Sequence, residues 1–103
     1  MMDRNDVNKC IDPVAVNRED VLEKAKACVS GDRDKQYGKP EDSFYRIALM
    51  WSAYLRTDVT AKDVALMMIL FKVAREEYKD KLDNWIDICG YAACGAECGR
   101  LDA

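Results

Sequence analysis

The chain has 103 residues but no histidine, and none of its five cysteines forms a CxxC pair. Without histidine there is no Ser-His or Cys-His pair to generate a nucleophile. Zinc usually takes four closely spaced ligands, often with histidine among them. We therefore expect reduced, mainly structural thiols, no metal site and no catalytic residue.

Also absent are a long hydrophobic run and an excess of charge of either sign. The longest apolar run, Val64 to Phe71, has eight residues, whereas crossing a bilayer takes about 20. The net charge of −3 gives no basic surface for repeated phosphate contacts, and there is no glycine-rich phosphate loop. The start of the chain carries no hydrophobic signal segment. We expect a cytoplasmic protein whose partners include neither a membrane nor a DNA or RNA polymer.

What is present is the composition of a globular domain, with 50% hydrophobic and 34% charged residues. No segment alternates apolar and polar residues between turn signals, so we expect no sheet. Residues 1–16 show no hydrophobic period and predict a flexible N-terminal arm. Residues 17–103 are then a single helical domain.

Helix-start signals and apolar residues at three- and four-residue steps predict four helices. The helices begin near Asn17, Pro40, Thr60 and Lys81. The links near residues 56–60 and 79–81 are short, which is typical of neighbouring helices that run in opposite directions. The fold class that we predict is all-α, an antiparallel four-helix bundle.

The last two helices have unusual surfaces. The third is apolar on every side from Val64 to Phe71 and should lie in the middle of the fold. The fourth is thin, because it is rich in glycine, alanine and cysteine. Small side chains let another helix approach closely, either within the chain or from a second copy. Because a small bundle gains from burying further surface, we expect a homo-oligomer, a dimer or larger.

A polar cluster is predicted where the third and fourth helices meet. With a turn near Asp80, residues of a helical hairpin face each other where their numbers sum to about 160. The cluster comprises Lys72, Arg75, Glu76, Asp83, Asn84 and Asp87, and Tyr91 continues its flank on the fourth helix.

Two interpretations of this cluster are open. In one, the charges form interhelical ion pairs, Lys72 with Asp87 and Arg75 with Asp83, which need no function. In the other, Lys72 and Arg75 grip phosphate oxygens. Asp83 and Asp87 then hold magnesium or receive hydroxyl and amino groups of a ligand.

The loop between the first two helices, residues 32–39, is long for a helical bundle. It is either a solvated connector or a ligand-covering loop in which Tyr37 stacks on a flat group. Trp51 and the pair Met67–Met68 are more typical of a core than of a base-stacking platform.

From Val21 to Glu97 the chain resembles a family of small uncharacterised proteins of bacteriophages and prophages. The motifs that carry this resemblance include Gly31-Asp32-Arg33, Gln36-Tyr37-Gly38, Trp51-Ser52-Ala53-Tyr54-Leu55, Lys72-Val73-Ala74-Arg75 and Leu82-Asp83-Asn84-Trp85-Ile86-Asp87-Ile88-Cys89-Gly90-Tyr91-Ala92. The resemblance implies the cytoplasm of a bacterial host and says little about activity.

A more distant resemblance is to the all-α nucleotide pyrophosphohydrolases of the MazG type. Those bundles hold magnesium with an ExxE motif on one helix and an ExxD motif on a later one. Asn84-Trp85-Ile86-Asp87 is similar to the second motif with its first acid replaced by asparagine, and the first motif is missing. The resemblance implies a nucleotide pocket with weakened metal chemistry.

These observations predict a phage-type protein that binds a phosphorylated, nucleotide-like ligand, and they favour a binding protein over an enzyme. One use for such a protein would be to sequester a host nucleotide (immune) signal without cleaving it. The candidate ligand-binding residues are Tyr37 for the base, Lys72 and Arg75 for phosphates, Asp83, Asn84 and Asp87 for ribose or base edges, and Tyr91 on the same flank.

Two alternatives stay open. The first is a magnesium-dependent nucleotide pyrophosphohydrolase, with Asp83 and Asp87 at the metal. The second is an interaction or structural protein without a ligand. No cofactor is expected unless the first alternative holds.

Overall fold

The computed structural model describes residues 16–31 and 38–98. These residues form four α-helices and no strand: α2 (Arg18–Val29), α4 (Pro40–Leu55), α5 (Ala61–Tyr78) and α6 (Leu82–Cys98). The predicted all-α class and the four predicted helices are therefore confirmed. The predicted N-terminal arm lies outside the described residues, except for Val16.

The helices begin where their capping residues predict. The Asn17 side chain accepts a hydrogen bond of 2.9 Å from the Asp20 amide at the start of α2. At α5, Thr60 and Asp63 form a reciprocal capping box with bonds of 3.0 and 3.1 Å. The hydrogen bonds from the Thr60 amide and hydroxyl also lower the pKa of Asp63. Pro40 occupies the first turn of α4, where its missing amide hydrogen costs nothing.

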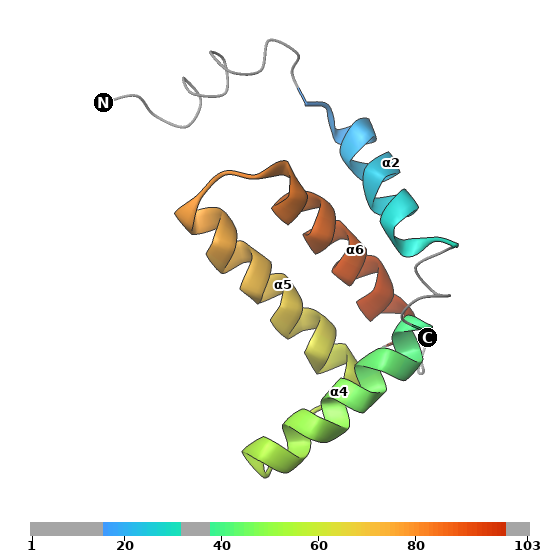
Figure 1. Ribbon diagram of the computed structural model, residues 1–103, viewed down its shortest axis with the longest axis vertical. Coiled ribbons are helices and arrows are strands. Elements are labelled where there is room, and N and C mark those ends of the chain that lie inside the picture. Colours follow the sequence, from blue (N-terminus) through green and yellow to red (C-terminus); the bar gives the residue numbers. More distant parts are fainter. Residues whose placement is uncertain (1–15, 32–37, 99–103) are drawn as a thin grey trace.

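Three of the helices, α2, α6 and α5, lie side by side in that order, and α4 crosses near the ends of α5 and α6 (Figure 1). The short link after Tyr78 joins α5 to α6 as a hairpin. The sequence predicts that the apolar third helix, α5, lies in the middle of the fold, but the middle helix of this row is α6. One side of α5 therefore faces away from the other described helices.

The core lies where α4 crosses the hairpin. Its most buried residues are Phe44, Ala48, Val64 and Ala65, with Ile47, Trp51, Val59, Ala61, Met68, Tyr91, Cys94 and Cys98 packed around them. The predicted core positions of Trp51 and Met68 are confirmed. The prediction for Met67 is wrong, because its side chain is 42% exposed on the outward side of α5.

The small residues of α6 are used within the chain. A Cβ added at Gly95 would lie 2.7 Å from the Cβ of Ala65 on α5, closer than two carbon atoms can pack. At Gly90 it would lie 3.4 Å from Val29 on α2. The thin helix thus sits between two neighbours, and Gly95 sets how closely α5 approaches.

The apolar stretch of α5 does not give the protein a membrane helix. Within the described residues, no helix combines the length and hydrophobicity that spanning a bilayer requires.

Substituting Gly95→Ala should lower the free energy of unfolding by about 1–3 kcal/mol, the usual cost of an overpacked core. The new methyl group would collide with Ala65. Urea unfolding followed by circular dichroism measures the change. Ala92→Ser, which adds one atom at an exposed position of the same helix, should change the value by less than about 0.5 kcal/mol. Equal effects of the two substitutions would contradict this account.

Candidate functional site

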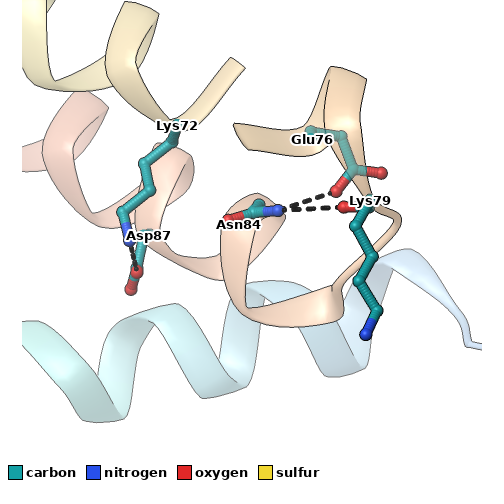
Figure 2. A network of polar contacts seen from close by, with 5 residues as sticks. All are labelled: Lys72, Glu76, Lys79, Asn84 and Asp87. Atoms are coloured by element: carbon teal, nitrogen blue, oxygen red, sulfur yellow. Dashed lines mark hydrogen bonds and ion pairs between the residues drawn. The ribbon is translucent and has the colours of Figure 1, made fainter. Parts of the chain in front are cut away.

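The residues of the predicted cluster divide into groups with different partners. At the turn of the hairpin, Asn84 and Glu76 are both buried, with 4% and 8% of their surface exposed. The Asn84 amide group donates to Glu76 Oε1 at 3.0 Å and makes a longer contact of 3.5 Å with the Lys79 carbonyl (Figure 2). The Lys81 amide donates to the same Glu76 oxygen at 3.0 Å. Asn84 therefore holds the turn together through its amide group.

The Glu76 carboxylate stays ionised in this buried place. Burial acts to raise its pKa, but the hydrogen bonds from Asn84 and from the Lys81 amide outweigh burial, and Asp80 and Trp85 add to the lowering. The resulting pKa is about 2. The carboxylate also lies at the amino-terminal end of α6, where the helix dipole favours negative charge.

One helical turn further along, Lys72 and Asp87 form an ion pair between α5 and α6. The Lys72 Nζ lies 2.8 Å from Asp87 Oδ2, and the side chains are 14% and 36% exposed (Figure 2). This is the pair that the hairpin register predicts, so that part of the ion-pair interpretation is confirmed. The Asp87 side chain is thus partly exposed, and the Lys72 side chain is mostly covered.

Arg75 does not form the predicted ion pair with Asp83. Its guanidinium carbon lies 4.6 Å from the centre of the Phe71 ring on the same helix, within the range of a cation–π contact. The Lys72 Nζ is 5.9 Å from the centre of the same ring. Two cations thus flank one half-exposed aromatic side chain, and Asp83 is exposed at the start of α6.

The two tyrosines of the predicted ligand set are elsewhere. The Tyr91 ring lies 6.3 Å from the Phe44 ring, centre to centre, and packs against the core. Tyr37 lies outside the described residues. The structure thus brings together Lys72 and Arg75 around Phe71 and pairs Lys72 with Asp87, but Asn84 and Tyr91 point to other neighbours.

The prediction from the sequence includes Glu76 in the polar cluster but not among the candidate ligand-binding residues. The structural role of Glu76 at the turn of the hairpin was not predicted. The residue numbers could have indicated this role, because 76 and 84 sum to 160, the value at which residues of the two helices face each other in the hairpin. A buried glutamate opposite an asparagine is a structural pair as readily as a ligand site.

A second group of ionisable residues surrounds Cys98 at the end of α6. Burial raises the pKa of the Cys98 thiol, and Glu41, Cys94 and Glu97 act in the same direction. A thiol of this kind is a poor nucleophile. Cys28, Cys89 and Cys98 are free thiols, and no group of three or more His, Cys, Asp or Glu residues within the described segments is arranged to hold a metal ion.

The fold and the site define a small all-α protein with a polar helical hairpin. The family described as a domain of unknown function, DUF6378, matches residues 20–99, and the chain belongs to this family. Two similar proteins are the Gene 55 proteins of Mycobacterium phages D29 and L5. No solved structure matches the chain.

Both relatives are 42% identical to the chain, over 77 residues for phage D29 and 74 residues for phage L5. The matches cover 74% and 70% of this chain but only 51% and 47% of the two relatives. The chain thus spans about half the length of the curated relatives it matches. The predicted membership of an uncharacterised phage family is confirmed, and the resemblance to MazG-type enzymes stays a prediction.

Because the pKa of Glu76 is depressed in the folded protein, its charge stabilises the fold above the ordinary pKa of 4.5, and this contribution is lost as the pH falls toward 2. Urea unfolding at a series of pH values should show this loss in the wild type. In Glu76→Gln the loss over the same pH range should be smaller.

The matched control is Glu23→Gln, which removes an exposed carboxylate from α2 and should keep the wild-type pH dependence. If Glu76→Gln also keeps it, the ionised Glu76 does not hold the hairpin.

Proposed function

We propose that the protein binds a phosphorylated, nucleotide-like ligand without cleaving it, and that Lys72 and Arg75 of α5 hold the phosphate. The observation that carries this proposal is the pair of cations around Phe71, at 5.9 Å and 4.6 Å from the centre of its ring. A guanidinium already held over a ring has less conformational freedom to lose when an anion arrives.

The donors of these two side chains suit a phosphate. Arg75 forms no ion pair within the described segments, so its five N–H groups are available for bidentate contacts with phosphate oxygens. Lys72 carries three donors, and its contact with Asp87 at 2.8 Å leaves others for a ligand. Asp83 and Asp87 would then receive hydroxyl or amino groups of the ligand.

In this proposal Asn84 orients the hairpin and does not contact the ligand, because its amide group donates to Glu76. Tyr37 keeps the proposed role of stacking on the base. The nucleotide character of the ligand rests on the distant resemblance to the MazG-type pyrophosphohydrolases. Sequestering a host nucleotide signal inside the bacterial host is the use that we propose for such a protein.

The scaffold that we propose for this function is an antiparallel four-helix bundle, present as a homo-oligomer. Its support within the chain is the short link that makes α5 and α6 antiparallel neighbours, whereas α2 packs along α6 in the same direction as α6 (Figure 1).

A second candidate function is an interaction protein whose charges serve only its own fold. The Lys72–Asp87 pair and the Asn84–Glu76 hydrogen bond favour it, because each uses a predicted ligand group inside the hairpin. The two candidates differ in whether any phosphorylated compound binds.

A single incubation separates the candidates. The purified protein is mixed with nucleoside triphosphates, dinucleotides and cyclic nucleotides in the presence of magnesium, and the free and heat-released fractions are analysed by mass spectrometry. We expect one intact compound to be depleted from solution and recovered on denaturation. Conversion of a triphosphate to a monophosphate would contradict this expectation and favour the enzyme alternative with Asp83 and Asp87. Absence of binding across the panel would favour the interaction protein.

For the compound recovered in that way, Arg75→Ala should raise the dissociation constant at least tenfold, because a hydrogen bond to a charged group contributes about 1.5–3 kcal/mol. Isothermal titration calorimetry measures the constant. Arg46→Ala removes an exposed arginine from α4 and should leave it unchanged. A wild-type constant in Arg75→Ala would contradict the proposed phosphate contact.

A further inference from the structure

A continuous apolar face is exposed along the outward side of α5. Its five large side chains are between 42% and 64% exposed: Leu66, Met67, Leu70, Phe71 and Val73. They recur at three- and four-residue steps and therefore share one side of the helix. Ala65, on the opposite side of the helix, is buried in the core. We call these five residues the α5 face.

The other described helices leave the α5 face uncovered. In the row of three helices α6 packs against one side of α5, and nothing described lies beyond the other side (Figure 1). A helix that is apolar all round is normally buried on all sides. With about 150–250 Å² for an aromatic side chain and less for Leu, Met and Val, the α5 face exposes on the order of 400 Å².

That area is within the range of about 300–600 Å² typical of the largest apolar patch on a monomer, and such patches are often functional. One partner of a standard protein interface buries about 800 Å². The α5 face with a polar rim at its two ends approaches that size. It is therefore large enough to be the apolar centre of an interface between two proteins.

The charges at the two ends of the face indicate which partner fits. Lys62 lies on the same side of the helix near its start, and Glu77 lies there near its end. Both are exposed, and neither forms an ion pair within the described segments. They are 15 positions apart, or about 22 Å along the helix axis, so they cannot neutralise each other within one chain.

We infer that the α5 face is the contact surface between two copies of this chain, with the two α5 helices packed antiparallel about a two-fold axis. A face with a positive end and a negative end is complementary to itself once it is reversed. In this arrangement Lys62 lies opposite the partner's Glu77, and Leu66 lies opposite the partner's Val73. Leu70 lies next to the axis.

The spacing of the residues supports this register. The seam starts at Lys62 and continues at steps of four, four, three and four residues through Leu66, Leu70, Val73 and Glu77. These steps are close to the repeat of about 3.5 residues that keeps one side of a helix against its partner. The only charges among these five positions are at the two ends, so the positions between them are all apolar.

This inference does not depend on the proposed ligand, and its test uses none. Leu70→Glu, at the most exposed position of the face, should convert a dimer into a monomer. Light scattering coupled to size-exclusion chromatography measures the mass, and circular dichroism checks that the helices remain. Leu22→Glu, at a position of α2 that is 59% exposed, is the matched control and should remain dimeric.

An exchange of the end charges tests the register. Lys62→Glu alone places like charges opposite each other twice in the dimer, and the dimer dissociation constant should rise on the order of tenfold. Glu77→Lys alone should act in the same way. The double variant K62E/E77K should restore the wild-type constant, and a mixture of the two single variants should form heterodimers. Both substitutions agree with the helix dipole, so neither should unfold α5.

A wild-type protein that is monomeric at high micromolar concentration would overturn the inference, and so would a dimer that survives Leu70→Glu. If Leu70→Glu dissociates the dimer but the charge exchange restores nothing, the antiparallel register is wrong. If the wild type is monomeric only as long as residues 1–15 or 99–103 are attached, those residues occupy the face in place of a second copy, which also contradicts the inference.

Discussion

The buried carboxylate of Glu76 is the group on which the arrangement of the α5–α6 hairpin depends. A buried charge is tolerated only where hydrogen-bond donors surround it. Here the donors come from Asn84 and from the backbone at Lys81, on the far side of the turn. The need to supply them fixes how α6 lies against α5. The same register brings Lys72 to Asp87 and allows Gly95 to approach Ala65.

In this arrangement the polar groups of the hairpin and its apolar side chains lie in different places. Polar groups between the helices are occupied with one another, as the pairs Asn84–Glu76 and Lys72–Asp87 show (Figure 2). Arg75 lies over the exposed Phe71 ring and forms no ion pair with a carboxylate of the described residues. The outward side of α5 is apolar between Lys62 and Glu77. The proposed ligand site and the α5 face meet at Phe71, whose ring carries Arg75 and is itself part of the exposed apolar side.

Much of this could be predicted from the sequence, because the signals are local. Asn17, Pro40 and the Thr60–Asp63 capping box act on backbone groups within three residues of themselves, so the helix starts follow from the sequence alone. The ion pair of Lys72 with Asp87 was also predictable, because a short link leaves a helical hairpin little choice of register. Membership of a phage family follows from motifs along most of the chain.

Other features depended on the tertiary structure. Asn84 is typical of a ligand-binding residue by type and position, but burial beside Glu76 gives it a structural partner. Met67 and Met68 are alike in the sequence, yet they differ by one step around α5 and face opposite surroundings. The sequence by itself determined where the helices are and which residues share a side, because those depend on backbone geometry and local hydrogen bonds. Only the tertiary structure decided which sides are covered, because the placement of α6 between α2 and α5 is a matter of packing between distant segments.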